Sequence, residues 1–206
     1  MKRLAVFVSG GGTNLQSLID GCESGAIKGG KIELVVSNKK DAFGLERAKN
    51  HGIRHVFIDA KAFASAAEFD RELAGLVNEN NIDLVCLAGY MKILSREFLD
   101  SVRAKVMNVH PALLPCFGGE GMYGMHVHEA VIESGVRVSG CTVHFVDYGA
   151  DTGPIIIQKA VPVEPGDTPG SLQKKILPFE HEAYAEAVKL YCADRLEVKG
   201  KKVFIK

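Results

Sequence analysis

Short apolar runs that alternate with helical stretches constrain the fold of this chain more than any other feature. The runs predict strands at residues 4–8, 32–36, 55–58 and 84–88, and the stretches between them predict helices at residues 14–22, 43–49 and 66–80. The last of these strands is unbroken in its apolarity, which is typical of a strand buried on both faces. Strands that alternate with helices indicate a mostly parallel sheet joined by right-handed crossovers.

The pattern changes after these strands, where the chain predicts an antiparallel portion. Residues 140–146 alternate and are rich in β-branched side chains, and residues 155–158 form a second such run. The turn-rich segment between them is too short for a crossover, so the two strands should pair antiparallel. A helix at residues 172–191 follows, and a short tail of strands or loop comes after Asp194. We therefore expect one α/β domain over residues 1–206: a Rossmann-like, mostly parallel sheet with helices on both faces and an antiparallel C-terminal portion.

An amide and an imidazole stand at the end of a further strand. Asn108 and His110 are two residues apart, so their side chains should point to the same face of that strand. Pro111 removes a backbone donor and restricts His110 to extended geometry, which ends the strand. A carboxamide can donate to a developing oxyanion while the ring supplies charge or a proton. A turn cap at Asn108 and a hydrogen-bonded core histidine at residue 110 are the alternative interpretation.

A carboxylate falls within reach of this pair in the predicted fold. Asp151 lies on the loop between the two antiparallel strands, where its side chain could face His110. An ionised neighbour favours the imidazolium, so we expect Asp151 to raise the pKa of His110 and keep the ring protonated. An aspartate that only closes an Asp-Thr-Gly turn is the alternative. His144, inside an apolar strand, is expected to steady the site through hydrogen bonds rather than to act as an acid or base.

Three glycines stand between the first strand and the first helix. The segment Ser9-Gly10-Gly11-Gly12-Thr13 precedes a helix that we expect Thr13 or Asn14 to cap. Backbone amides without side chains can approach an anion, and the helix N-terminus adds partial positive charge, so a phosphomonoester on a ribose would fit. No Gly-Lys-[Ser/Thr] follows, and Leu15 replaces the last glycine of the dinucleotide-binding pattern. A tight turn without a ligand is the alternative.

Charge and cysteine content exclude several classes of protein. The 25 basic and 25 acidic side chains balance, so no overall field favours nucleic acid or a membrane surface. Five cysteines without a Cys-x-x-Cys pair are typical of reduced thiols. No apolar stretch has the length of a membrane span or the pattern of a signal peptide, so we expect a cytoplasmic protein. His126 and His128 could supply two metal ligands, but no further side chains complete a set, and we expect no metal.

Four blocks of the sequence resemble one enzyme family over nearly the whole chain. They are Ser-Gly-Gly-Gly-Thr-Asn-Leu at residues 9–15, Ser-Asn-Lys to Glu-Arg-Ala at 37–48, Asn-Val-His-Pro-Ala-Leu-Leu-Pro at 108–115, and His-Phe-Val to Asp-Thr-Gly-Pro at 144–154. In this order and spacing they are similar to folate-dependent phosphoribosylglycinamide formyltransferases. The resemblance implies transfer of a formyl group from 10-formyltetrahydrofolate to the amine of glycinamide ribonucleotide, which gives formylglycinamide ribonucleotide in de novo purine biosynthesis.

The resemblance also implies roles for the two halves of the domain. Residues 1–105 would bind the phosphoribosyl substrate, and residues 106–206 would bind folate and carry the catalytic groups. The implied catalytic residues are Asn108, His110 and Asp151, with direct attack of the amine on the formyl carbon. The implied contacts to glycinamide ribonucleotide are Gly12, Thr13, Asn14 and Glu180. The implied folate contacts are Met91, Lys92, Ile93, Leu94, Asn108, Asp147, Tyr148, Gly149, Ala150 and Asp151.

Two features depart from the family pattern. Ala66, in the loop expected before the third long helix, stands where family members commonly carry a folate-contacting arginine, which leaves Lys61 as the nearest upstream cation. The glycine-rich segment at residues 116–125 is longer than in the shortest relatives, and it is either a mobile flap over the site or a plain surface loop. For Glu180, a solvated charge on a helix is the alternative to substrate binding.

Three other functions fit parts of the same pattern. Methionyl-tRNA formyltransferase shares the Asn-x-His-Pro core but has a further nucleic-acid-binding domain at its C-terminus. Formyltetrahydrofolate deformylase shares the three polar residues but carries an N-terminal regulatory domain, and water replaces the amine. A non-catalytic nucleotide- or folate-binding module would bind these ligands without formyl transfer. We expect small-molecule substrates, no nucleic-acid or membrane partner, and a monomer or a homodimer.

Overall fold

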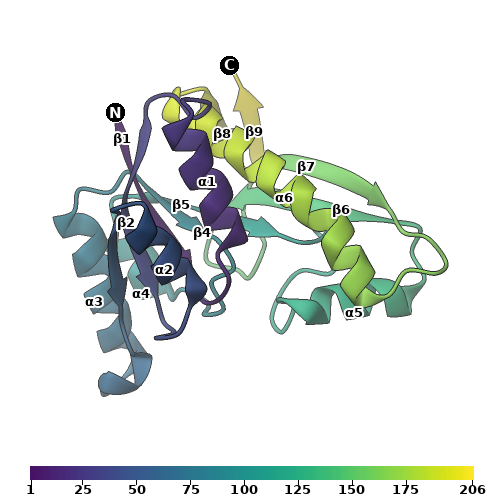
Figure 1. Cartoon of the computed structure of the whole chain (residues 1–206), viewed down its shortest axis with the longest axis horizontal. Coiled ribbons are helices and arrows are strands. Elements are labelled where there is room, and N and C mark those ends of the chain that lie inside the picture. The colour runs from purple at the N-terminus through teal and green to yellow at the C-terminus, as the bar shows by residue number, and fades with distance from the viewer. The chain divides into compact units, whose positions relative to one another are not determined.

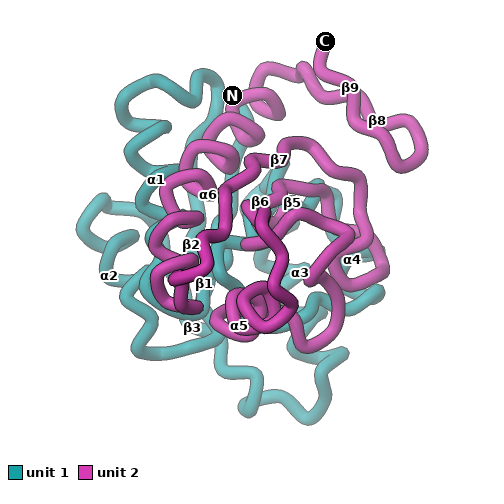
Figure 2. Tube along the Cα trace, turned by 90° about the vertical axis from the view of Figure 1, so that its right-hand side faces the viewer, with its two compact units in different colours: residues 1–107 teal, residues 108–206 magenta.

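The chain forms two compact units (Figures 1 and 2). The computed structural model describes all residues 1–206. Unit 1 comprises Met1–Met107 and unit 2 comprises Asn108–Lys206, coloured teal and magenta in Figure 2. The boundary falls inside strand β5 (Lys105–His110).

Parallel strands that alternate with helices build unit 1. Its elements before β5 are β1 (Lys2–Val8), α1 (Thr13–Glu23), β2 (Gly30–Ser37), α2 (Phe43–Asn50), β3 (Arg54–Phe57), a 3-10 turn (Ala60–Ala62), α3 (Ala66–Glu79), β4 (Leu84–Leu87) and α4 (Arg96–Ser101). The strand order is β3-β2-β1-β4, and each of these pairs is parallel. Right-handed crossovers place α1 and α2 on one face of the sheet and α3 on the other, because β2 and β3 are added on one side of β1 and β4 on the other side. Accordingly, α1 packs against α2 and α3 packs against α4.

The apolar runs recognised in the sequence supply the core of unit 1. All four residues of β4 are buried, as the unbroken run predicted. On α3, the side chains of Phe69, Leu73 and Val77 are buried at helical spacing. Each such side chain contributes roughly 1.5–3 kcal/mol through removal of apolar surface from water. The predicted alternation of strands and helices in this half of the chain is confirmed, with element ends shifted by one or two residues.

Unit 2 continues from the end of β5 into an antiparallel arrangement. Its further elements are α5 (Met125–Ser134), β6 (Val138–Phe145), β7 (Ile155–Pro162), α6 (Pro169–Cys192), β8 (Leu196–Lys199) and β9 (Lys202–Ile205). The pair β6–β7 is antiparallel, as the short connection predicted, and β8–β9 is a second antiparallel pair. Strand β9 also pairs parallel with β7, through Ile155 and Lys202. Helix α6 packs on β6 and β7 and against α5.

Some element ends and two helices differ from the sequence-based expectation. Helix α6 begins three residues earlier than predicted, because Thr168 and Ser171 form a reciprocal cap and Pro169 occupies the first helical position. Helices α4 and α5 were not predicted. A glycine-rich segment precedes α5 and obscured its helical spacing, although Gly135 ends the helix in the left-handed conformation that C-caps favour. None of the helices combines the length and apolarity that crossing a bilayer requires.

Gly140→Ala should destabilise unit 2. A Cβ atom at residue 140 would lie 1.9 Å from the carbonyl oxygen of Lys159 on the paired strand β7. Because the strands cannot separate there without losing hydrogen bonds, we expect the free energy of unfolding to fall by at least about 2 kcal/mol in urea denaturation. Gly170→Ala is the matched control, since a Cβ there meets nothing within 4 Å. Equal stability of the two variants would contradict this account of the β6–β7 pair.

Candidate active site

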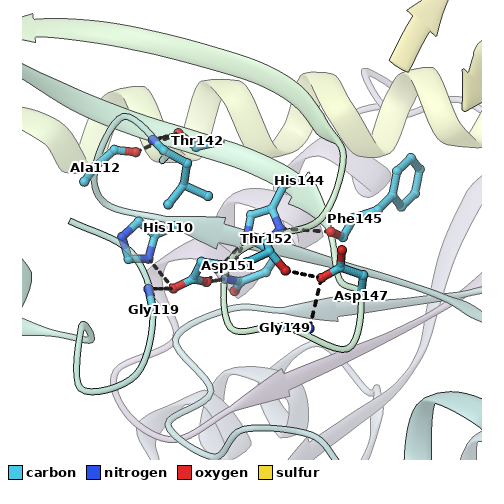
Figure 3. Close-up of polar contacts among 12 residues, drawn as sticks. His110, Ala112, Gly119, Thr142, His144, Phe145, Asp147, Gly149, Asp151 and Thr152 are labelled. Carbon is cyan, nitrogen blue, oxygen red and sulfur yellow. Dashed lines mark hydrogen bonds and ion pairs between the residues drawn. The ribbon is translucent and has the colours of Figure 1, made fainter. Parts of the chain in front are cut away.

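Four polar side chains meet at the end of β5 in unit 2 (Figure 3). Nδ1 of His110 and Nε2 of His144 each lie 3.5 Å from a different oxygen of the Asp151 carboxylate. Nδ2 of Asn108 lies 3.5 Å from Oδ1 of Asp151 and 3.3 Å from Nε2 of His144. Asn108 and His110 therefore point to the same face of β5, as their spacing predicted. Strands β5 and β6 and the β6–β7 loop together supply the cluster.

The Asp151 carboxylate is held in place by the main chain as well as by the histidines. Its second oxygen accepts a hydrogen bond of 3.0 Å from the amide of Gly119. The backbone of Asp151 is left-handed, with φ of +57°, a conformation that few residues other than glycine adopt. Turn closure in this loop is carried instead by Asp147, which accepts from the Gly149 amide and the Thr152 hydroxyl. The alternative interpretation of Asp151 as a simple turn residue is therefore wrong.

The glycine-rich segment after β5 contacts the cluster directly. Nε2 of His110 lies 2.7 Å from the carbonyl oxygen of Phe117, and the Gly119 amide bonds to Asp151. A carbonyl oxygen only accepts, so Nε2 of His110 carries the hydrogen and Nδ1 faces the carboxylate. Of the two interpretations left open for residues 116–125, a plain surface loop is wrong for this first part of the segment. Phe117 and Gly119 were not among the site residues predicted from the sequence, although their closeness to His110 in the sequence was a signal.

Burial decides the charge of His110. His110 is 3% exposed, and this desolvation lowers the pKa of its ring below the ordinary value of 6.5, while Asp151 and the Phe117 carbonyl act in the opposite direction. The expected net rise in the pKa of His110 is therefore wrong. For Asp151, burial acts to raise the pKa, but hydrogen bonds from His144 and Gly119, together with the positive charge that His110 carries when it is protonated, lower it. The site thus rests with a neutral imidazole beside an ionised carboxylate.

A buried hydrogen-bond network supports the segment that follows His110. Oγ1 of Thr142 donates to the carbonyl oxygen of Ala112 (2.7 Å, Figure 3) and accepts from the amide of Leu114 (3.0 Å). Nε2 of Gln158 donates to both Thr142 Oγ1 and the Leu114 carbonyl. Thr142 on β6 and Gln158 on β7 thereby hold both the amide and the carbonyl of Leu114, which lies in the segment after β5. Thr142 and Gln158 were not predicted from the sequence, because nothing in a strand's own pattern shows which loop its polar side chains meet.

In unit 1, helix α2 orients the glycine loop after β1. The amide of Gly44 donates to the carbonyl of Gly10 (3.0 Å), and Nε of Arg47 donates to the carbonyl of Gly11 (2.8 Å). In a trans peptide the following N–H points opposite to the carbonyl, so the amides of Gly11 and Gly12 point away from α2. Gly12 is left-handed (φ +68°), and a Cβ on it would lie 2.8 Å from the Cα of Gly44. Two main-chain donors are thus presented together beside the N-terminus of α1.

The cap of α1 differs from the expectation. Gly12 is the N-cap residue and offers no side-chain bond, whereas Thr13 or Asn14 was expected to cap. Thr13 is exposed at the first helical position, and Asn14 is 8% exposed. The N-terminal amides of α1 are consequently not covered by a capping side chain.

Ser9 joins three loops that follow parallel strands of unit 1. Its hydroxyl donates to Oδ1 of Asn38 after β2 (2.6 Å) and accepts from the amide of Met91 after β4 (2.9 Å). Its own amide donates to the carbonyl of Gly89. The segment expected to contact folate begins at Met91, so its position depends on this serine. From the sequence, Ser9 was recognised only as part of the glycine motif.

The side chains of the segment expected to bind folate in unit 1 differ in exposure. Met91 is 48% exposed and Ile93 68%, while Leu94 is 7% exposed and belongs to the core. Nζ of Lys92 lies over the ring of Phe69, 4.5 Å from its centroid. A flat ligand could therefore meet the side chains of Met91 and Ile93 but only the main chain of Leu94. Separately, Ala66 is the first residue of α3, which confirms the predicted helix start at residue 66. Its expected place in the loop before that helix is therefore wrong.

Other candidate residues of unit 2 are placed as follows. Glu180 lies on α6 and is 8% exposed, so the interpretation as a solvated helix charge is wrong. In the 147–151 loop, Tyr148 is 63% exposed. On α5, His126 is exposed and His128 is buried. No group of three or more His, Cys, Asp or Glu side chains in the structure is arranged to hold a metal ion.

Comparison with known proteins places the chain in a class. A family model described as formyl transferase matches residues 2–188, which include the glycine loop and the polar cluster. The chain is 45% identical over 197 residues to phosphoribosylglycinamide formyltransferase, chloroplastic, from Arabidopsis thaliana, covering 95% of this chain and 67% of the relative. It is 38% identical over 205 residues to phosphoribosylglycinamide formyltransferase from Haemophilus influenzae, covering 100% of this chain and 94% of the relative. Other curated relatives are longer, and the chain spans as little as 14% of their length.

A solved structure agrees with these sequence matches. Glycinamide ribonucleotide transformylase 1 from Symbiobacterium toebii superposes with a TM-score of 0.94 at 44% identity, covering 100% of this chain and 94% of that one. The chain therefore belongs to the phosphoribosylglycinamide formyltransferase family. The resemblance stated from the four motifs is confirmed. So is the expected fold class, a mostly parallel α/β sheet with an antiparallel C-terminal portion.

Acid should weaken the fold through its buried histidines. Burial, and then the charge of His110, lowers the pKa of His128 to about 4, and its Nδ1 has no hydrogen-bond partner. The unfolded chain therefore binds more protons than the folded one between about pH 6.5 and 4. Stability is fully present above pH 6.5 and is lost as the pH falls through this window, by at most about 1.4 kcal/mol per pH unit for each such histidine.

His128→Leu should reduce the slope of the free energy of unfolding against pH by the contribution of one proton. The slope is measured by chemical denaturation between pH 7 and 4.5. The matched control is His126→Leu on the same helix, where the ring is exposed and the slope should stay that of the unmodified chain. An unchanged slope in His128→Leu would show that residue 128 titrates alike in the folded and unfolded chains.

Proposed function

We propose that this chain transfers a formyl group from 10-formyltetrahydrofolate to the amine of glycinamide ribonucleotide, giving formylglycinamide ribonucleotide in de novo purine biosynthesis. The observation that carries the proposal is the cluster in which Asn108 and His110 both lie within 3.5 Å of the Asp151 carboxylate. It stands in a chain whose family and fold are those of phosphoribosylglycinamide formyltransferases.

His110 would act as the proton carrier. Nε2 is bonded to the Phe117 carbonyl, so Nδ1 is the ring atom that can take up a proton. The ring is neutral at rest and accepts the proton that the attacking amine loses. Asp151, 3.5 Å from Nδ1, then stabilises the imidazolium, and the proton passes on to the departing nitrogen. The sequence-based expectation was a His110 ring that is protonated before the reaction. A ring that is neutral before the reaction takes its place, because burial disfavours the imidazolium.

Asn108 would stabilise negative charge on the formyl oxygen. Its Nδ2 contacts to Asp151 and His144 are 3.5 and 3.3 Å, which is long for hydrogen bonds. An amide donor held so loosely can turn toward a developing oxyanion with little loss. The imidazolium formed at His110 adds a positive charge nearby, so the oxyanion and the proton carrier stabilise each other. This chemistry requires no metal ion.

The glycine loop of unit 1 would bind the phosphate of glycinamide ribonucleotide. The amides of Gly11 and Gly12 point away from α2, and the N-terminus of α1 adds partial positive charge beside them. A phosphate oxygen can accept from both amides, with Thr13 and Asn14 at the start of the helix. Glu180, a buried carboxylate of unit 2, is proposed to accept from a polar group of the same substrate.

The folate donor supplies the formyl group on a nitrogen that can leave. Two segments suit a flat heterocycle with polar edges. In unit 1, the exposed side chains of Met91 and Ile93 can pack on its faces, while main-chain groups of Lys92 and Leu94 can pair with its edge. In unit 2, the loop from Asp147 through Tyr148, Gly149 and Ala150 to Asp151 offers further main-chain groups and one exposed aromatic ring.

We propose that the reaction takes place in the cytoplasm and involves small molecules only. Asn108, His110 and Asp151 all come from unit 2 of one chain, so a second copy is not needed to complete the cluster. A monomer and a homodimer are both compatible with the proposal.

Asn108→Ala and His110→Ala should each lower kcat by at least about a hundredfold, because each removes a group that stabilises the oxyanion. His126→Ala, an exposed histidine of α5, is the control and should keep kcat within about twofold of the unmodified enzyme. Turnover is followed as formylglycinamide ribonucleotide formed. Near-normal turnover in either site variant would remove that residue from the chemistry.

The choice of acceptor is tested with the purified chain and 10-formyltetrahydrofolate in parallel reactions. Formylation of glycinamide ribonucleotide is expected, with little release of formate when the amine is omitted. Formate release that does not need the amine would favour a deformylase, and formylation of methionyl-tRNA would favour the tRNA enzyme. Ligand binding without turnover would favour a binding module.

A further inference from the structure

The C-terminal hairpin reaches the loop that carries Asp151. Strands β8 and β9 lie beyond residue 188, where the match to the family model ends. Strand β9 pairs with the start of β7 through Lys202 and Ile155. Because only Gly153 and Pro154 separate β7 from the 147–152 loop, this pairing places the hairpin turn beside that loop. The turn presents Lys201.

Lys201 bonds to both ends of this loop. Its Nζ lies 2.9 Å from Oδ2 of Asp147, at the start, and 2.7 Å from the carbonyl oxygen of Thr152, at the end. The other oxygen of Asp147 accepts from the Gly149 amide (3.2 Å) and the Thr152 hydroxyl (2.6 Å). One carboxylate therefore gathers three donors, one of which comes from outside the loop. Figure 3 shows the part of this arrangement that lies within the loop.

The electrostatics of Asp147 agree with this geometry. Partial burial acts to raise the pKa of its carboxyl group, but hydrogen bonds from Thr152 and Lys201 outweigh burial and lower it. The carboxylate is therefore ionised at neutral pH and keeps its bond to the lysine. An isolated ion pair this exposed, with Lys201 71% and Asp147 32% exposed, contributes little. Lys201 differs from such a pair because the same ammonium group also ties the far end of the loop.

The clamped loop contains a backbone conformation that needs support. Asp151 has φ of +57°, and a non-glycine residue stays in that region only when its surroundings over-determine it. The Gly119 amide and the two histidines hold its side chain, but they do not hold the loop ends. The ends of the loop are held by Asp147 and Lys201.

We propose that Lys201 is a positioning residue, through which the C-terminal hairpin fixes the 147–152 loop and hence the Asp151 carboxylate and the folate-binding main chain. The inference rests on the proposed function for its kinetic consequence, but the clamp itself is independent of it. Loosening the loop should weaken folate binding more than it slows chemistry, because histidine contacts to Asp151 remain. Binding of the ribonucleotide at the glycine loop should not change.

The clamp is tested first without any substrate. Hydrogen exchange of peptides covering residues 147–153 should be about three- to fivefold faster in Lys201→Met than in the unmodified chain. Lys202→Met removes the same charge from the same hairpin and should leave this exchange unchanged. Lys201→Arg should restore most of the protection. Equal exchange in all four proteins would overturn the proposal, and it would do so whatever the enzyme's activity.

The positioning role is tested by steady-state kinetics of the same variants. Lys201→Met should raise KM for 10-formyltetrahydrofolate about three- to fivefold, while kcat and KM for glycinamide ribonucleotide stay within about twofold. The difference from the unmodified enzyme should shrink at 1 M salt, which screens exposed ion pairs. Faster exchange with unchanged KM for the folate would refute the positioning role. Failure of the unmodified chain to transfer formyl groups would refute the proposed function and leave the exchange result standing.

Discussion

The buried carboxylate of Asp151 is the constraint on which the rest of the site depends. Its side chain is 15% exposed, and a charge so nearly removed from water persists only with hydrogen-bond partners. The Asn108 amide group and the Gly119 main-chain amide donate to it, and the rings of His110 and His144 each lie 3.5 Å from one of its oxygens. These groups come from β5, β6 and the segment after β5. The ends of β5 and β6, the segment after β5 and the β6–β7 loop must therefore all be in place at once. The C-terminal hairpin extends this set through Asp147.

Much of this arrangement follows from local patterns in the sequence. The strands could be predicted because burial on both faces leaves an unbroken apolar run, as in β4. Asn108 and His110 could be placed on one face because side chains in a strand alternate with period two. The antiparallel pairing around Asp151 followed from the length of the connection. Each of these inferences needs only residues that are close together in the chain.

What could not be predicted depends on contacts between distant segments. The pKa of His110 moves down rather than up because the ring is almost fully buried, and the depth of burial is not encoded near residue 110. Thr142 and Gln158 support a loop that precedes them by many residues. Lys201 meets Asp147 across 54 residues, and a lysine in a hairpin turn carries no local sign of such a partner.

The engagement of the Gly10 and Gly11 carbonyls by α2 has a consequence for reading related sequences. The direction in which the loop's amides point is set by Gly44 and Arg47, which lie more than thirty residues downstream of the glycine run itself. A relative could retain every glycine and still present its amides differently if the partner helix changed. Anion recognition of this kind is a joint property of two segments, and comparison of the short motif alone would overlook half of it.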